Sequence, residues 1–246
     1  MFFFWPGGRL RAQTESSCRD AVWNEPSAGV AVTALNPCGS ARNPDPAVVA
    51  TVEVGSIGEE LGFEPGDQLL SINGVRPRDL IDYRYLIVEE ELTLEVLDSS
   101  GEVHRVEFEK DADDGLGLAF TEALFDGLRQ CNNRCPFCFI DQQPPGHRNS
   151  LYLKDDDYRL SFLYGSYLTL TNLSEADWSR IEQQRLTPLF VSVHATDPDL
   201  RSALLENPRA GRLLQQLEWF GERDLQIHAQ VVVCPGLNDG KALLQS

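Results

Sequence analysis

The sequence predicts two parts of different fold class, a small β-rich module followed by an α/β domain built on a parallel sheet. In the first part, residues 92–97 and 103–108 alternate apolar and polar side chains with a period of two, as half-buried strands of a hairpin do. In the second part, the apolar runs 189–193 and 227–233 are separated by helical patterns, as expected of parallel strands buried on both faces. A chain of 246 residues with 42% apolar content is long enough for two modest domains.

The first 46 residues mix proline, glycine, serine, asparagine and alanine, and follow neither the helical nor the strand period. Such a composition buries too little apolar surface to offset the entropy of ordering the chain. We therefore expect residues 1–46 to be a disordered N-terminal extension. Cys18 and Cys38 lie in this segment, isolated in sequence from each other and from the other cysteines, and we expect neither to be functional.

Residues 47–110 have the pattern of a compact β-module. Asn73-Gly74 follows one apolar run and is the strongest short signal for a tight turn after a strand. The expected elements, in chain order, are a strand at 48–52, a helix from 55 to 61, a turn at 63–67, and strands at 68–72, 92–97 and 103–108. An acidic, glycine-rich stretch at 111–117 is expected to join this module to the rest of the chain.

Residues 111–246 alternate strand and helix patterns. Ser174 and Asp177 have the spacing of a capping box, and Asp197 and Asn207 each stand before a proline at a helix start. The expected strands are 118–125, 167–171, 189–193 and 227–233, and the expected helices cover 174–184, 198–206 and 208–221, with another beginning at 238. Repeated βα units of this kind predict a parallel sheet with right-handed crossovers.

The strongest chemical signal is a set of three cysteines within eight residues, Cys131, Cys135 and Cys138, in the spacing C-x3-C-x2-C. Iron–sulfur clusters and structural zinc sites both normally take four protein ligands. Three thiolates without a nearby fourth cysteine therefore favour a [4Fe–4S] cluster with one iron left open to a ligand that is not protein. Such an open position suits catalysis better than electron storage. Ferredoxin-type runs begin C-x2-C-x2-C and add a fourth cysteine, so their spacing differs.

Other interpretations of the three cysteines stay open. They would serve a zinc site if Cys234 or His194 supplied a distant fourth ligand. They would be purely structural if all three were buried as small apolar side chains. A disulfide framework is disfavoured, because six cysteines in 246 residues are sparse compared with small secreted disulfide-rich domains.

The cysteine spacing resembles that of the radical S-adenosylmethionine (radical SAM) superfamily. The flanking sequence resembles one family within it. Four segments are similar to the DUF512 iron–sulfur oxidoreductases: CNNRCPFCFIDQQPPG (131–146), KDDDYRLSFLYGSYLTLTNL (154–173), VSVHAT (191–196) and QVVVCPGLND (230–239). The string GSIGEELGFEPGDQLLSINGV (55–75) resembles the PDZ domains of bacterial proteases and scaffold proteins. The cyanobacterial branch of the DUF512 family carries such a PDZ-like segment in front, and the resemblance covers roughly residues 47–246.

The resemblance implies an oxidoreductase in which the open iron of a [4Fe–4S] cluster binds S-adenosyl-L-methionine (SAM). Reduction of the cluster by an electron donor such as ferredoxin or flavodoxin then cleaves SAM to methionine and a 5′-deoxyadenosyl radical. The radical acts on a substrate that no residue identifies. The family domain is a partial (β/α) barrel of six repeats, so the four strands expected over 111–246 leave it incomplete at the C-terminus and leave the completeness of the cofactor site open.

The same resemblance indicates which residues contact SAM. Thr171 and Asn172 stand at the strand end where relatives often carry Gly-Gly-Glu for the SAM amino group, and their oxygens can accept hydrogen bonds from an ammonium. Phe137 stands where relatives often place an aromatic residue near adenine, or it covers the cluster. His194 follows an apolar strand, and contacts SAM or substrate or serves as a hydrogen-bonded structural histidine. Cys234 is a substrate-side thiol, a ligand of a second site or a small buried apolar residue.

Charge and hydropathy restrict which partners and which cellular location are expected. The 38 acidic against 21 basic residues give a net charge of −17, which repels nucleic-acid phosphates and anionic lipid, so neither is an expected partner. No apolar run approaches the ~20 residues of a membrane span. The apolar start at Met1–Trp5 ends at Pro6, short of the roughly 7–15 residues of a signal peptide, and we expect a cytoplasmic protein. The acidic run 155–157 is expected to be a solvated loop.

Together these patterns predict a radical SAM iron–sulfur enzyme with a PDZ-like module in front. Such a module is a candidate binder of an extended peptide that adds to its sheet edge. It shows no obvious carboxylate-binding loop, and the alternative is that it binds nothing. The rival to the enzyme is a PDZ-type adaptor whose iron–sulfur or zinc site is structural or redox-sensing, without turnover of SAM.

Overall fold

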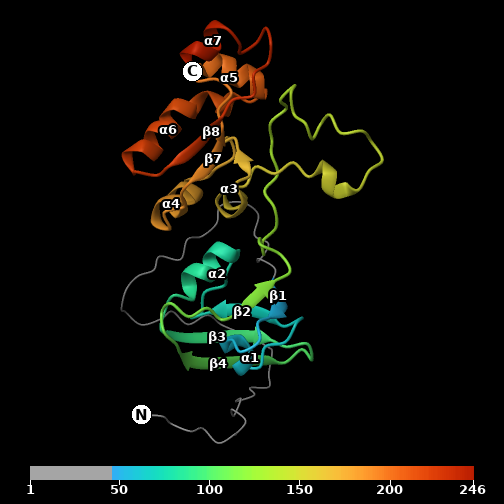
Figure 1. The fold of residues 1–246 in the computed structure, drawn as a ribbon, viewed down its shortest axis with the longest axis vertical. Helices are drawn as coiled ribbons and strands as arrows, with labels where there is room; N and C mark the ends of the chain where they lie inside the picture. The colour runs from blue at the N-terminus through green and yellow to red at the C-terminus, as the bar shows by residue number, and fades with distance from the viewer. Residues whose placement is uncertain (1–45) are drawn as a thin grey trace, which may run out of the picture. The chain divides into compact units, whose positions relative to one another are not determined.

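The computed structural model describes residues 46–246, which form two compact units (Figure 1). Among these residues the first unit ends at Gly127 and the second begins at Leu128. Cys18, Cys38 and the predicted N-terminal extension up to residue 45 lie outside the described residues. Within residues 46–246, no helix combines the length and the apolar character that crossing a bilayer would require.

The first unit is built on a five-stranded antiparallel sheet in the order β4-β3-β2-β1-β5. Its strands are β1 (Ala47–Val52), β2 (Gln68–Ile72), β3 (Glu91–Leu97), β4 (Val103–Glu109) and β5 (Leu118–Phe120). The helices α1 (Ile57–Glu60) and α2 (Leu80–Leu86) accompany this sheet (Figure 1). Leu69, Ile72 and Leu94 have no exposed surface and form the centre of the core. The predicted strands of the β-module are confirmed.

The turn after β2 shows why the Asn-Gly dipeptide stands there. Asn73 and Gly74 have positive φ values of 49° and 75°, the left-handed backbone that these two residue types adopt most readily. The turn lets Val75 pair back with Ile72. The Asn73 side chain also accepts a hydrogen bond from the backbone N–H of Thr93 at 2.8 Å, which fastens the turn to β3.

The strand β5 belongs to the sheet of the first unit, where it pairs antiparallel with β1 at the edge. The prediction that residues 118–125 form the first strand of the parallel sheet is therefore wrong. The apolar residues Leu118 and Phe120 flank an exposed residue, which is the alternation of an edge strand rather than of a strand buried on both faces. Phe120 packs edge-on against Tyr83 and Phe125, with ring centroids 4.8 and 5.3 Å apart, and these contacts hold the segment in the first unit.

The second unit is an α/β structure with a three-stranded parallel sheet in the order β6-β7-β8. The strands are β6 (Tyr167–Leu168), β7 (Leu189–Ser192) and β8 (Ile227–Gln230). The helices are α3 (Tyr158–Tyr164), α4 (Glu175–Gln183), α5 (Pro198–Leu205), α6 (Leu213–Glu222) and α7 (Lys241–Gln245), with 3-10 turns η1 (Asn149–Tyr152) and η2 (Pro208–Arg212) (Figure 1). The predicted parallel pairing of these three strands is confirmed, while a partial barrel stays a prediction.

The helix starts follow the predicted capping residues. Ser174 and Asp177 form the reciprocal capping box at the start of α4. Asp197 caps α5 and Asn207 caps η2, each by accepting a hydrogen bond from a backbone N–H of the first turn. The helix predicted over 208–221 instead opens with the 3-10 turn and becomes α-helical only from α6 onward.

A buried arginine ties the carboxyl ends of the strands together. Arg201 of α5 has no exposed surface, and its guanidinium donates to the carbonyl oxygens of Val193 (2.8 Å), Ala210 (2.6 Å), Thr169 (2.9 Å) and Ser192 (2.8 Å). Burial lowers the pKa of Arg201 to about 10. The guanidinium stays charged near neutral pH, so these four carbonyls provide the hydrogen bonds that its burial requires.

Replacing Arg201 by methionine keeps the length of the side chain and removes the donors that the guanidinium offers to four carbonyls. We expect Arg201→Met to lower the free energy of unfolding by about 3 kcal/mol. Urea unfolding followed by the fluorescence of Trp178 and Trp219, both in the second unit, would measure this loss. The exposed Arg212, replaced in the same way, is the control and should cost less than about 0.5 kcal/mol. Equal midpoints for the two variants would contradict the role of Arg201.

Candidate functional site

The segment 131–138, which we call the cysteine loop, is held at several points along its backbone. All three of its cysteines are free and half-buried. The N–H of Cys131 donates to the carbonyl of Lys154 at 2.7 Å, and the N–H of Arg134 donates to the carbonyl of Leu205 at 3.0 Å. The loop is thus fastened both to the segment that precedes α3 and to the end of α5.

Asn133, inside the first cysteine spacing, anchors the loop through its side chain. Only 2% of Asn133 is exposed. Its amide nitrogen lies 3.3 Å from the sulfur of Cys131, 2.9 Å from the hydroxyl of Thr169 and 3.1 Å from that of Thr171. Its amide oxygen accepts from the side chain of Asn207 at 2.7 Å. This network joins the cysteine loop to the carboxyl end of β6 and to the start of η2.

Two carboxylates of the predicted acidic loop are buried rather than solvated, so that expectation is wrong for them. Asp156 is 1% exposed and accepts from the backbone N–H and the hydroxyl of Thr169, both at 2.6 Å. Asp157 is also 1% exposed, caps α3 and pairs with the buried Arg159 at 2.7 Å. Burial raises the pKa of Asp156. The acidic run therefore supports the strand end and the helix start beside the cysteine loop.

The thiols of the cysteine loop interact electrostatically with one another. Burial raises the pKa of Cys135 to about 11, and negative charge on Cys131 and Cys138 raises it further. Burial also raises the pKa of Cys131, with the charge of Asp156 acting in the same direction. Since the thiolate is the form that binds metal, loading this loop with a metal cluster would release protons.

The sulfurs of the cysteine loop do not converge on one point in the described residues. Two thiolates on one zinc ion, each about 2.3 Å from it, lie at most about 4.6 Å apart. Among the described residues, the three cysteines do not belong to any set of three ligand atoms within 4.8 Å of one another, either alone or with Cys234 or His194. Each thiolate of a [4Fe–4S] cluster binds a different iron, so a cluster does not require its ligands to converge on one point.

The two residues predicted to contact the SAM amino group differ in whether an oxygen is left without a hydrogen-bond partner. Thr171 is 4% exposed, and its hydroxyl is engaged by Asn133 and Thr169, so it serves the internal network. Asn172 donates from its amide nitrogen to the carbonyl of Asp156 at 2.9 Å. Its amide oxygen is buried and has no hydrogen-bond partner among residues 46–246. A buried, unpartnered acceptor of this kind fits a donor supplied by a ligand.

Phe137 and His194 lie together, with ring centroids 4.8 Å apart in an edge-to-face contact. His194 is 5% exposed and has a left-handed backbone with φ of 63°. Its Nδ1 accepts from the N–H of Val232 at 3.2 Å, and its carbonyl accepts from the side chain of Asn238 at 2.7 Å. Burial lowers the pKa of His194 to about 4, with the charge of Arg201 acting in the same direction. The imidazole is therefore neutral near pH 7, with its proton on Nε2.

Cys234 is not part of the thiol group. It is half-buried, and its sulfur lies 3.8 Å from the carbonyl oxygen of Val232. Its backbone N–H donates to the side chain of Asn238 at 2.6 Å. These contacts make it part of the turn after β8.

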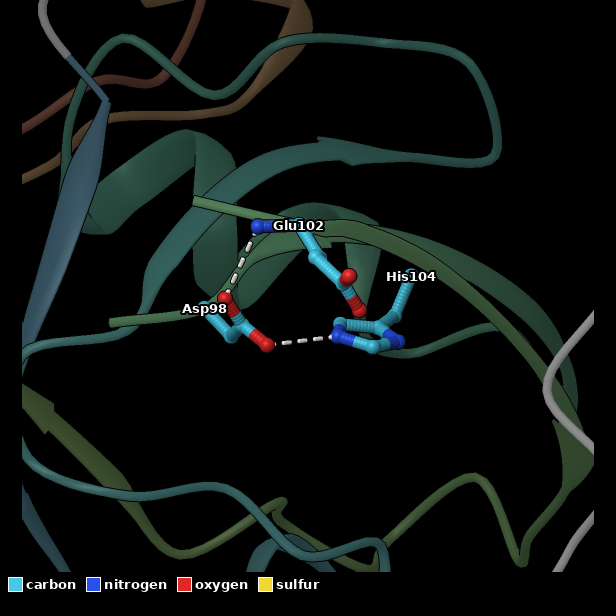
Figure 2. Close-up of side chains that lie close together, drawn as sticks. All are labelled: Asp98, Glu102 and His104. Atoms are coloured by element: carbon cyan, nitrogen blue, oxygen red, sulfur yellow. Dashed lines mark hydrogen bonds and ion pairs between the residues drawn. The ribbon is translucent and has the colours of Figure 1, made fainter. Parts of the chain in front are cut away.

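A second group of titratable side chains lies on the hairpin between β3 and β4 (Figure 2). Asp98, Glu102 and His104 bring one ligand atom each within 4.8 Å of the others. Asp98 accepts from the N–H groups of Ser100 and Glu102 at 2.8 and 2.9 Å, and its second oxygen lies 2.7 Å from Nε2 of His104. The bonds from His104 and Ser100 hold the pKa of Asp98 well below its usual range. These bonds stabilise the turn of the hairpin, and the turn brings the three side chains together.

The first unit contains a groove that the sequence patterns did not reveal. Gly115–Ala119, at the start of β5, and the residues Tyr83, Arg84 and Ile87 on or next to α2 line a space of about 400 Å³. The glycine-rich stretch, predicted only to join the two parts, is one wall of this groove. A Gly-Leu-Gly triplet immediately before an edge strand is the signal that would have identified it.

The backbone of the Gly-Leu-Gly triplet is oriented by hydrogen bonds to the body of the unit. The carbonyls of Leu116 and Gly117 accept from the N–H groups of Gly58 and Glu53 at 2.8 and 2.9 Å. In a trans peptide the N–H points opposite to the carbonyl, so the N–H groups of Gly117 and Leu118 point away from α1 and β1. Gly117 has φ of 69°, and a Cβ there would lie 2.2 Å from that of Ser56, so glycine is required.

Comparisons with known proteins match both parts of the chain. The family model described as a Radical SAM-like domain matches residues 110–246, more than half of the chain, and a PDZ domain model matches residues 48–98. The crystal structure of the PDZ domain of the SdrC-like protein from Listeria innocua is similar at 16% identity, covering 33% of this chain and 99% of that chain with a TM-score of 0.27. No curated protein matches the chain.

The buried neutral His194 makes the stability of the second unit dependent on pH. An unfolded histidine takes up a proton below about pH 6.5, whereas His194 does so only near pH 4. The unfolded state thus binds more protons within this window, and stability falls as the pH falls from 6.5 to 4, by roughly 3 kcal/mol in total from this group. His194→Asn, which tolerates the left-handed backbone and keeps an acceptor, should flatten this decline.

Urea unfolding at pH 7, 5.5 and 4.5, followed by tryptophan fluorescence, measures the difference between the two proteins. His228→Asn, on the exposed side of β8, is the matched control and should decline as the parent does. Parallel declines for the parent and His194→Asn would show that the buried imidazole does not control this loss.

Proposed function

We propose that this chain, which belongs to the Radical SAM-like domain family and also carries a PDZ domain, binds a [4Fe–4S] cluster and cleaves SAM. The two matches confirm the sequence-based predictions of a radical SAM-like domain and a PDZ domain. The finer placement, among the DUF512-type oxidoreductases and their cyanobacterial branch, is supported by the four quoted segments and is part of the proposal. The partial barrel around the parallel sheet is also part of the proposal.

The observation that carries the proposal is the cysteine loop itself. Cys131, Cys135 and Cys138 are half-buried, electrostatically coupled and fixed by Asn133 to the carboxyl end of β6. Ligands of open parallel α/β sheets bind beyond the carboxyl ends of the strands, which is where this loop is anchored. Three thiol ligands leave one iron of a [4Fe–4S] cluster free for SAM.

The neighbouring residues fit SAM in specific ways. The unpartnered buried oxygen of Asn172 suits the SAM ammonium, which has hydrogens to donate. Phe137, whose ring packs edge-on against His194, offers an aromatic contact for adenine within the cysteine loop. We propose that Thr171 acts through Asn133 rather than on SAM directly, because its hydroxyl is already engaged.

A cluster held by Cys131, Cys135 and Cys138 would supply one electron to SAM, and this would break a carbon–sulfur bond to give methionine and a 5′-deoxyadenosyl radical. That electron comes from an external carrier such as a ferredoxin or a flavodoxin. That radical would take a hydrogen atom from the substrate. In this proposal Asn133 positions the cysteine loop, and Asn172 and Phe137 contact SAM.

The cluster and its ligands can be tested by iron, sulfide and EPR measurements on anaerobically purified protein. We expect about four irons and four sulfides per chain, and an EPR signal of the reduced protein that changes when SAM is added. Cys135→Ala should lose the cluster, while Cys234→Ala should keep it. Asn172→Ala should keep the iron and lose the response to SAM. A parent protein without iron, or a Cys135→Ala variant that still cleaves SAM, would overturn the proposal.

Peptide binding is the second candidate function, favoured by the groove beside β5. The strand β5 is an edge strand, so an extended peptide can add to it as another strand. The N–H groups of Gly117 and Leu118 point away from α1 and β1 and suit a peptide carboxylate, and the exposed Arg84 on α2 lines the same groove. We infer that the partner is a peptide with a free C-terminal carboxylate.

Screening the protein against random peptides with free C-termini, followed by fluorescence polarisation, tests this function. We expect Arg84→Glu to weaken the tightest peptide about tenfold, which corresponds to about 1.4 kcal/mol. Amidation of the peptide C-terminus should weaken it at least as much. Arg105→Glu, on the strand β4 at the opposite edge of the sheet, is the matched charge reversal and should have little effect. Equal binding of amidated peptides would exclude carboxylate recognition.

A further inference from the structure

Lys154 contacts the cysteine loop at its start, in its middle and beyond its end. Its backbone carbonyl accepts from the N–H of Cys131 at 2.7 Å. Its ammonium donates to the carbonyl of Asn133 at 3.0 Å and to the carboxylate of Asp141 at 2.5 Å. Lys154 therefore contacts the first cysteine through its backbone, and its side chain contacts Asn133, between the first two cysteines, and Asp141, three residues after the last.

The ammonium of Lys154 interacts with the thiols through its charge. The pKa of Lys154 is raised: burial opposes the rise, and the bond with Asp141 and the negative charges on Cys138 and Cys131 outweigh it. In return, the charge of Lys154 acts to lower the pKa of Cys131 and Cys135. The geometry agrees: the ammonium lies 3.0 Å from the carbonyl oxygen of Asn133, which stands between the first two cysteines.

The ion-pair partner of Lys154 also reaches the cysteine loop, because the carboxylate of Asp141 hydrogen-bonds with the thiol of Cys138. The side chain of Asp141 is 53% exposed, whereas that of Lys154 is 20% exposed. Water and salt screen an exposed charge more strongly than a partly buried one. The charge of Lys154 is therefore screened less than that of Asp141.

We propose that Lys154 is a positioning residue whose ammonium raises the reduction potential of the cluster held by Cys131, Cys135 and Cys138. The inference rests on the proposed function. Reduction adds one electron from the external carrier and makes the cluster more negative by one charge, with no bond formed or broken at Lys154. A nearby cation stabilises this added charge, and the potential of an iron–sulfur cluster depends on the charge around it.

Potentiometric EPR titration of the reconstituted full chain, without SAM, tests this role. Lys154→Met keeps the apolar stem and removes the charge, and should shift the one-electron equilibrium about tenfold toward the oxidised cluster, or about 59 mV more negative. Lys154→Arg keeps the charge and should restore most of the shift. Lys241→Met removes a charge from the exposed start of α7 and is the matched control, expected to stay within twofold of the parent.

A second variant covers the case in which Lys154→Met does not hold iron. Asp141→Asn removes the exposed anion and leaves Lys154 in place, so the potential should move in the positive direction. An unchanged or more negative potential for Asp141→Asn, or equal shifts for Lys154→Met and Lys154→Arg, would overturn the inference. A parent protein that holds no cluster would overturn the proposed function instead, and iron analysis before the titration separates the two failures.

Discussion

Thr169, the first residue after β6, is the point on which the candidate site of the second unit depends. Its backbone N–H and its hydroxyl donate to Asp156, and its hydroxyl also accepts from the side chain of Asn133. Its carbonyl accepts from the guanidinium of Arg201. A single strand end thus connects a buried acid, the cysteine loop and a buried base. The position of the thiols follows from this connection, because Asn133 lies between the first two cysteines.

The energetics of this centre are those of a fully bonded polar network rather than of an ion pair. Burial is the largest influence on both charged groups: it raises the pKa of Asp156 and lowers that of Arg201, while each charge partly offsets the effect on the other. Hydrogen bonds compensate for this burial, four to carbonyls from Arg201 and two to Asp156 from Thr169. A network of this kind is favourable only when its members are satisfied together. It therefore favours one position of the cysteine loop.

The sequence predicted what depends on short spacing and missed what depends on distant contacts. The three cysteines and the capping box of Ser174 are visible because each pattern closes within eight residues. The role of Asn133 depends on Thr171 and Asn207, which are 38 and 74 residues away in the chain. The buried acids were predicted to be solvated because three consecutive aspartates have that composition. Their partners, a threonine 13 residues on and a nearby arginine, decide otherwise.

The strand β5 shows a different limit, because its pattern is compatible with either sheet. Three residues are too few for periodicity to separate a buried parallel strand from a half-buried edge strand. Tertiary pairing decides, since β1 offers an open edge and Phe120 packs between Tyr83 and Phe125. The family match begins at residue 110, whereas the contacts of the first unit extend to Gly127. A cut at residue 110 would remove β5 and the glycine wall of the groove, leaving β1 as an unpaired edge. The PDZ unit therefore needs the residues up to 127 both to close its sheet and to keep its candidate binding site.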